Sequence, residues 1–83
     1  MPEDEVRNVA KLFVEIGNVN MMTIQIGLHF GYPKSYAIFQ ELARLEIISA
    51  DAHGGYNILA KLDQIDDIFD NDSKYMNAQQ SLL

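Results

Sequence analysis

The 83-residue sequence contains no cysteine. A disulfide framework, thiolate chemistry and the usual structural zinc sites are therefore excluded, and packing alone must stabilise the fold. No apolar run is long enough to span a bilayer, and the acidic start Met1-Pro2-Glu3-Asp4-Glu5 is unlike a signal peptide. These absences predict a soluble, cytoplasmic protein without a membrane partner and, at this length, a single small domain.

Basic residues are also scarce, because six lysines and arginines stand against twelve acidic residues, for a net charge of −6. An excess of acid disfavours nucleic acid as a partner, since neutralised phosphates supply most non-specific affinity. The excess lies at the two ends of the chain, however, and between Val6 and Ala60 four acidic residues are balanced by four basic ones. The centre of the chain is not acidic, which leaves both nucleic acid and protein open as partners.

Patterns for catalysis and metal binding are missing as well. No serine or threonine occurs in a recognisable pattern with a histidine and a carboxylate that would activate it as a nucleophile. No glycine-rich phosphate-binding loop occurs either. His29 and His53 lack the His-x-x-x-His or Glu-x-x-His spacing of a metal site. The C-terminal aspartates lack the glycine and the terminal glutamate of a calcium loop. We therefore expect neither an enzyme nor a bound cofactor or metal ion.

Three segments show the apolar periodicity of helices. The first runs from Pro2 to Ile16 and ends at Gly17-Asn18; its expected buried stripe is Val6, Val9, Ala10, Phe13 and Ile16. After a one- or two-residue strand at Val19, a short helix is expected from Met21 to about Leu28, capped by Asn20. A third helix should begin after an extended Tyr32, with Pro33 in its first turn, and run to about Glu46. One core is expected to contain Phe13, Ile24, Leu28, Ile38, Leu42, Leu45 and Ile48.

The remainder of the chain predicts a hairpin and a further helix. Strands are expected over residues 47–49 and 56–59, joined by turn residues that include Gly54-Gly55. A helix-turn-helix followed by a hairpin is a winged helix, so the predicted fold class is α+β, mostly α, with this domain over residues 1–60. An acidic amphipathic C-terminal helix is expected over residues 61–70, packed by Leu62, Ile65 and Phe69 onto the domain or onto a second copy of the chain. A flexible tail is expected over residues 71–83.

Residues 4–59 resemble the C-terminal gamma domain of FtsK-type DNA translocases. The features that carry the resemblance are Phe30-Gly31-Tyr32, the helix segment Ile38-Phe39-Gln40-Glu41-Leu42, then Glu46-Ile47-Ile48-Ser49, a His-Gly-containing wing, and Asn57-Ile58-Leu59. The resemblance implies a winged helix that reads short orienting sequences in duplex DNA and contacts a tyrosine recombinase. Where such domains carry their basic residues, the side chains here that can be cationic are Lys34 and His29.

Candidate contacts to duplex DNA lie on the third helix and the wing. In a helix-turn-helix protein the N-terminal part of this helix enters the major groove, where Lys34 and Ser35 could contact phosphate and Gln40 could pair with adenine. Arg44 shares a face with Lys34, although a solvated Glu41–Arg44 pair is the alternative interpretation. In the wing, His53, Tyr56 and Asn57 could touch the adjacent backbone or minor groove, or could form an ordinary exposed hairpin.

Other residues are candidates for protein contacts. Met22 and Tyr36 are the apolar side chains for which the helix pattern leaves exposure open. The aspartates Asp63, Asp66, Asp67 and Asp70 could imitate a row of phosphates toward a basic partner, or simply form the wet face of a helix.

Two functions follow. The first is a small DNA-associated regulatory or accessory module that binds duplex DNA modestly, as a homodimer or beside a recombinase or other DNA-processing protein. The alternative is a winged helix that has lost DNA reading and binds a protein partner, with the acidic C-terminal segment engaged in that contact. A continuous positive strip on the third helix would favour DNA, and an acidic or apolar face would favour protein.

Overall fold

The computed structural model describes residues 3–75. Its elements are, in chain order, the helices α1 (Glu3–Ile16), α2 (Met21–Gly27) and α3 (Tyr32–Arg44), the strands β1 (Ile48–Ala50) and β2 (Tyr56–Ile58), the 3-10 turn η1 (Leu62–Gln64) and the helix α4 (Ile65–Asn71). The two strands pair antiparallel, with Ser49 opposite Asn57 at the centre of the register. The fold is thus α+β, mostly helical: a winged helix-turn-helix with a two-stranded wing and an added C-terminal helix.

Local chemistry explains where the second and third helices begin. The Asn20 side chain accepts a hydrogen bond from the backbone N–H of Met22 at 2.8 Å and so caps α2, as expected from the sequence. Gly31, in extended backbone, is the N-cap of α3, and Pro33 occupies its first turn, where a missing N–H costs nothing. The expectation that Tyr32 stays extended was wrong, because Tyr32 is the first residue of the helix.

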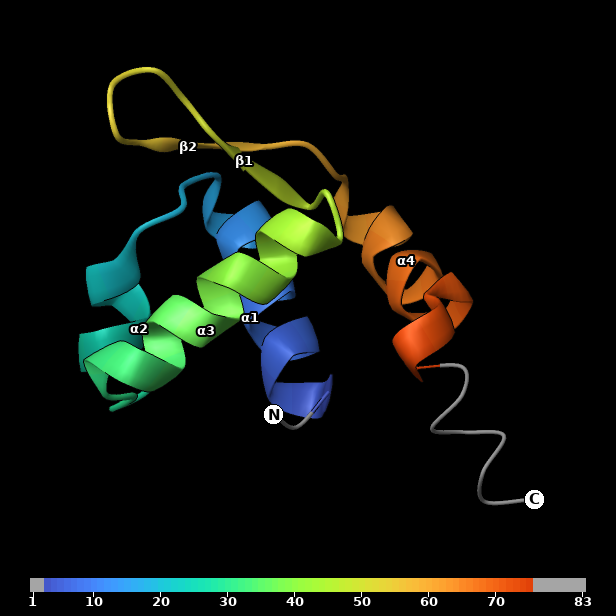
Figure 1. Ribbon diagram of the computed structural model, residues 1–83, viewed down its shortest axis with the longest axis horizontal. Coiled ribbons are helices and arrows are strands. Elements are labelled where there is room, and N and C mark those ends of the chain that lie inside the picture. The colour runs from blue at the N-terminus through green and yellow to red at the C-terminus, as the bar shows by residue number, and fades with distance from the viewer. Residues whose placement is uncertain (1–2, 76–83) are drawn as a thin grey trace.

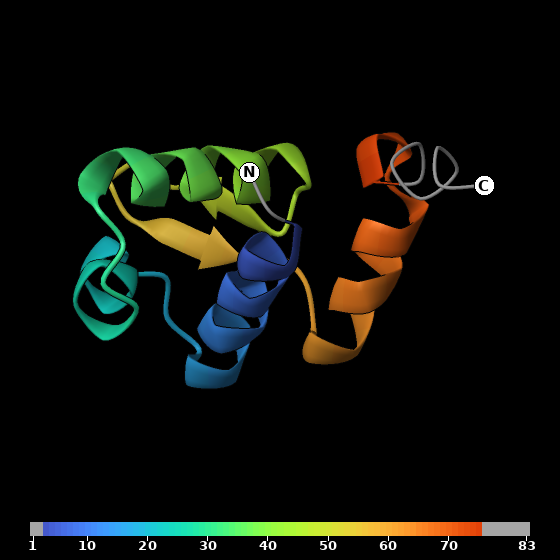
Figure 2. The ribbon, with the colours of Figure 1, turned by 90° about the horizontal axis from the view of Figure 1, so that it is seen from below.

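The elements assemble around one core (Figure 1). The views in Figures 1 and 2 place α1 and α3 in the middle, the hairpin across one side, α2 at one end of the molecule and α4 at the other. The buried apolar residues are Val6, Val9, Ala10, Phe13, Ile24, Ile38, Phe39, Leu42, Leu45, Ile47, Ile48, Ala60, Ile65, Phe69 and Tyr75. Edge-to-face contacts of Phe39 with Phe13 and with Tyr56, at ring-centroid distances of 5.5 and 5.1 Å, join α1, α3 and the wing.

Three expected core residues lie outside this core. Ile16, Leu28 and Leu62 are 54%, 39% and 43% exposed. Each stands at the beginning or end of a helical element, where the rest of the domain leaves its side chain uncovered. The helical periodicity was right for the interior of each element and wrong at these ends.

Several boundaries also differ from the sequence-based expectations. Val19 forms no strand, since the sheet of the described chain consists of β1 and β2 alone. The helix α3 ends at Arg44 rather than near Glu46, and each strand spans three residues, with β1 shifted to Ile48–Ala50. The early end of α3 has a physical cause: Glu46 adopts a left-handed backbone with φ of 60°. This conformation cannot continue a right-handed helix.

The C-terminal segment is part of the domain. The helix expected over residues 61–70 is divided into η1 and α4. As expected, Ile65 and Phe69 of α4 are buried against the domain, with contacts between α4 and α1. The expectation of a flexible tail from residue 71 was wrong for residues 71–75: Asn71 ends α4, and Tyr75 is buried in the core. Residues 76–83 of that expected tail lie outside the described residues.

The end of α3 allows a stability prediction. The N–H groups of Glu46 and Ile47 bond back to the carbonyls of Ala43 and Leu42, the Schellman pattern in which glycine is usual at the left-handed position. Glu46→Gly should therefore stabilise the domain by about 0.5–1 kcal/mol in chemical denaturation, because it relieves the strain of a side chain there. Ala43→Gly, in the exposed helical backbone of α3, is the control and should destabilise by about 1 kcal/mol. Equal losses in both variants would contradict the prediction.

Candidate recognition surface

The helix-turn-helix presents α2 and the first turns of α3 at one end of the molecule (Figure 1). A short connection holds them together: the Phe30 N–H bonds to the Ile24 carbonyl at 3.3 Å, and His29 takes a left-handed backbone with φ of 58°. Ile24 is fully buried beneath this corner. The outward side chains of both helices are consequently fixed relative to the core.

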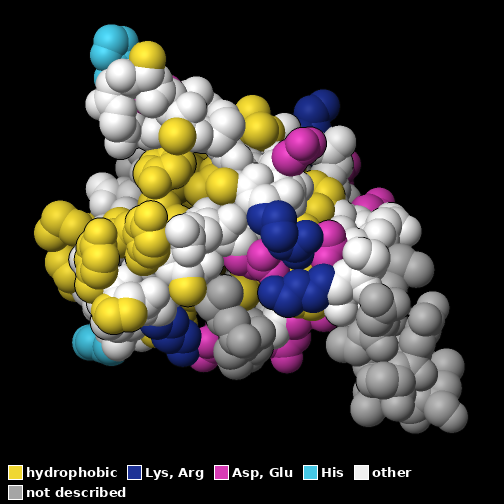
Figure 3. All heavy atoms as spheres, viewed as in Figure 1, with side chains coloured by type: hydrophobic (Ala, Val, Ile, Leu, Met, Phe, Trp, Pro, Cys, Tyr) yellow, Lys and Arg dark blue, Asp and Glu magenta, His cyan; other side chains and the backbone are white. Residues whose placement is uncertain are grey.

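Large apolar residues are prominent among these outward side chains. Five large hydrophobic residues here are exposed by 39–64%, and together they are called the apolar end surface: Met22, Ile26, Leu28, Tyr32 and Tyr36. Figure 3 shows hydrophobic side chains gathered over this end of the molecule. Spacings of four residues place Met22 above Ile26 on α2 and Tyr32 above Tyr36 on α3. The two tyrosine rings are stacked, with centroids 6.1 Å apart and planes at 13°.

Lys34, the principal phosphate-contacting candidate, is engaged by its own domain. Its ammonium nitrogen lies 2.7 Å from a carboxylate oxygen of Glu5 in α1 and 4.1 Å from the centroid of the Phe30 ring. The Glu5 carboxylate therefore competes with phosphate for this ammonium group. The pairing was invisible in the sequence because Glu5 precedes Lys34 by nearly thirty residues.

The other α3 candidates behave differently from one another. Ser35 is fully buried, so the expectation that its hydroxyl reaches phosphate was wrong. Gln40 is exposed and remains accessible. Arg44 donates to Glu41 within α3 and also to Asp72 at 3.0 and 3.1 Å. The expected Glu41–Arg44 pair therefore forms and is extended by Asp72, but it is not a solvated pair, because Glu41 is buried at 7% exposure.

Ion pairing extends to nearly all the basic residues. Five of the six lysines and arginines have a carboxylate oxygen within ion-pair distance, and the five are Arg7, Lys11, Lys34, Arg44 and Lys74. The sixth, Lys61, lies after the wing and makes no ion pair with residues 3–75. No continuous positive strip therefore runs along the part of α3 that would enter a groove.

The wing is shaped by Asp51. One carboxylate oxygen of Asp51 accepts the backbone N–H groups of His53 at 2.8 Å and Gly55 at 2.9 Å, which closes the turn. His53 and Asn57 are exposed, as contact candidates must be. Tyr56 is half-buried with its ring against Phe39, so its role is packing between the wing and α3.

The acidic segment is likewise turned toward the domain. Asp66 pairs with Arg7 at 2.8 Å and Lys11 at 3.0 Å, and Asp70 pairs with Arg7 at 3.2 Å. Hydrogen bonds from Arg7 and Lys11 lower the pKa of Asp66. Asp63 and Asp67 are exposed and form no ion pair within residues 3–75. Asp66 and Asp70 thus have basic partners inside the chain, although both side chains remain more than half exposed.

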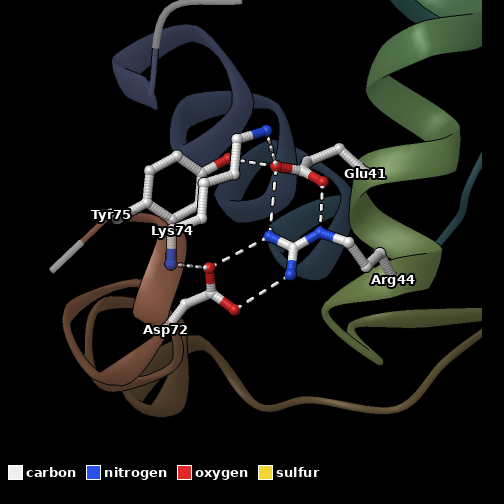
Figure 4. Close-up of polar contacts among 5 residues, drawn as sticks. All are labelled: Glu41, Arg44, Asp72, Lys74 and Tyr75. Atoms are coloured by element: carbon white, nitrogen blue, oxygen red, sulfur yellow. Dashed lines mark hydrogen bonds and ion pairs between the residues drawn. The ribbon is translucent and has the colours of Figure 1, made fainter. Parts of the chain in front are cut away.

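A second network lies between α3 and residues 72–75 (Figure 4). The Glu41 carboxylate accepts from Arg44 at 2.6 and 3.2 Å, from Lys74 at 2.9 Å and from the Tyr75 hydroxyl. The Arg44 hydrogen bond, followed by those of Tyr75 and Lys74, lowers the pKa of Glu41 to about 2 although burial opposes this. Burial and the Glu41 carboxylate raise the pKa of Tyr75. The network is structural, because Tyr75 and Glu41 are both almost fully buried.

Sequence reasoning named Met22 and Tyr36 and missed the rest of the apolar end surface. Ile26 carried a signal in the sequence, because two positions, about 200° of helix, separate it from the expected core position Ile24. In the structure it is the most exposed of the five residues, at 64%. Tyr32 could have been found from its spacing of four residues before Tyr36. Leu28 gave no signal, since its spacing from Ile24 predicts burial.

No group of three or more metal-ligating side chains occurs among residues 3–75, and no helix of that part is long and apolar enough to cross a bilayer. Comparisons with protein-family models, with curated proteins and with solved structures found no match.

Proposed function

We propose that this domain is a protein-interaction module in which a winged helix serves as the scaffold and the apolar end surface is the docking site. The observation that carries the proposal is the chemistry of the outward face of α2 and the start of α3. A duplex reader needs cations and polar side chains there. This chain has Met22, Ile26 and two stacked tyrosines, exposed by 46–64%.

The size of the surface supports the same conclusion. Five side chains exposed to this extent present on the order of 500 Å² of apolar area, at the upper end of what soluble monomers expose. Tyrosine and methionine are enriched at protein interfaces, and tyrosine often supplies much of the binding energy. A surface of this composition has a large free-energy gain from being covered by another protein.

Electrostatics weighs against the DNA alternative. Contact with phosphates would require Lys34 to leave Glu5, or Arg44 to leave Glu41 and Asp72. Each exchange replaces an existing ion pair and yields little net affinity, and the overall charge of −6 repels the duplex. Duplex binding is therefore the outcome that would overturn the proposal.

Two measurements test it. In a duplex titration at about 50 and 200 mM salt, we expect no measurable binding by the full chain. With a photo-crosslinking amino acid in place of Tyr36, irradiated cells should yield protein adducts, and Ile26→Asp should abolish them. The matched control carries the same amino acid in place of Leu62 of η1, which is 43% exposed. It should give none of these adducts. Duplex binding that Lys34→Ala weakens and Ile26→Asp leaves unchanged would instead favour DNA reading.

A further inference from the structure

The charge distribution around the apolar end surface bears on what covers it. The surface holds no uncompensated charge: its neighbour Lys34 is neutralised by Glu5 at 2.7 Å. The acidic elements η1 and α4 lie at the other end of a molecule that is 43 Å along its longest axis (Figure 1). A strongly basic partner would be steered to that acidic end, away from the apolar one.

We propose that the occupant of the apolar end surface is a second copy of this chain, in a symmetric dimer; this inference rests on the proposed function. Two such surfaces meeting head to head would place no unpaired charge against another. Their acidic ends would point apart. The distance between them would be several Debye lengths, since the Debye length is about 8 Å at physiological salt. The net charge of each copy therefore opposes this arrangement only weakly.

The available area matches what such a contact needs. A standard interface buries about 800 Å² on each partner, of which somewhat more than half is apolar. The roughly 500 Å² of the apolar end surface equals that apolar share. Polar side chains beside it, Gln25, His29 and Gln40, supply a rim. A two-fold interface brings the same patch together from both copies, so the Tyr32–Tyr36 stacks of the two copies become a four-ring aromatic cluster.

The test is the solution mass of the full chain, measured by sedimentation equilibrium from about 1 to 500 µM, since interfaces of this size bind in the micromolar range or tighter. We expect the mass to double over this range. Ile26→Asp and Tyr36→Asp should each weaken association by about 30-fold or more, because each places a charge in the apolar contact. Leu62→Asp puts the same charge on an exposed apolar position outside the surface and should leave association unchanged. Circular dichroism checks that every variant is folded.

A symmetric contact can be separated from other modes of association by mixing variants. The variants Tyr36→Asp and Tyr36→Lys should each be monomeric alone and should associate when combined. The four-ring cluster would place position 36 of one copy against position 36 of the other, so that the aspartate meets the lysine. A parent chain that stays monomeric throughout, a dimer that neither aspartate variant weakens, or a mixture that stays monomeric would overturn the dimer. The proposed function fails separately: a monomer that still yields Tyr36 cross-links to another protein refutes only the dimer, whereas duplex binding without such cross-links refutes both.

Discussion

Phe69→Ala is expected to lower the free energy of unfolding by about 3–5 kcal/mol, which is a large part of the total for a small domain. Phe69 is fully buried, its ring centroid lies 5.2 Å from that of Tyr75, and the Arg7 guanidinium carbon lies 5.0 Å above it. Removing the ring leaves a cavity and deprives Tyr75 of its packing. The contact between α4 and α1 should weaken together with the Arg7–Asp66 pair that lies over it.

Urea denaturation followed by circular dichroism measures this effect. Leu62→Ala, in the adjacent η1 turn, is the control and should change stability by less than about 0.5 kcal/mol, because Leu62 is 43% exposed. A Phe69→Ala loss below about 1 kcal/mol would show that the C-terminal helix contributes little to the domain. The expected result would establish that a stable domain requires residues beyond the wing.

The second large effect concerns Glu41 and acid. Hydrogen bonding, first of all from Arg44, lowers the pKa of this carboxyl from 4.5 to about 2. A depressed pKa stabilises the folded state above the unfolded value, and that stability is lost as the pH falls through the folded value. The shift corresponds to about 3 kcal/mol, present at neutral pH and lost between about pH 4.5 and 2. Glu41 is 7% exposed, so solvent screens this contribution only weakly.

Glu41→Gln keeps the shape of the side chain and removes its charge. At pH 7 the variant should be less stable than the parent by about 3 kcal/mol, and the difference should shrink as the pH falls from 4.5 toward 2. Glu15→Gln, at an exposed position of α1 that forms no ion pair within residues 3–75, tests the loss of charge alone and should change stability by less than about 0.5 kcal/mol. A Glu41→Gln difference that stays constant with pH would mean that the network acts through shape and not through the carboxylate.

Much of the fold was predictable because its signals are local. The stripe of Val6, Val9, Ala10 and Phe13 repeats at helical spacing and is buried as expected. Asn20 and Pro33 mark helix starts by chemistry that acts within one turn. The errors lie at the ends of elements and in short segments. There, the strand expected at Val19 and the burial expected of Leu28 depended on neighbouring elements and not on local pattern.

The candidate surface was predictable only in part. Met22 and Tyr36 are exposed, as their positions allowed, whereas Ser35 is buried one position from Lys34. A helix turns about 100° per residue, so neighbouring positions cannot share a role on one face. Ser35 therefore faces the core while Lys34 stays partly exposed, so the expectation that Ser35 reaches phosphate failed for a geometric reason.

By itself, the sequence determined the helices, the hairpin, their order and hence the winged-helix arrangement, because these depend on spacings of two to four residues and on capping and turn chemistry. Only the tertiary structure decided which basic side chains have no carboxylate partner inside the described part of the domain. Arg7 meets Asp66, Arg44 meets Asp72 and Lys34 meets Glu5 across 59, 28 and nearly 30 residues. Such partners are chosen by how whole helices pack, which no local pattern encodes. That packing gives most of the basic residues a carboxylate partner and leaves the apolar end surface exposed.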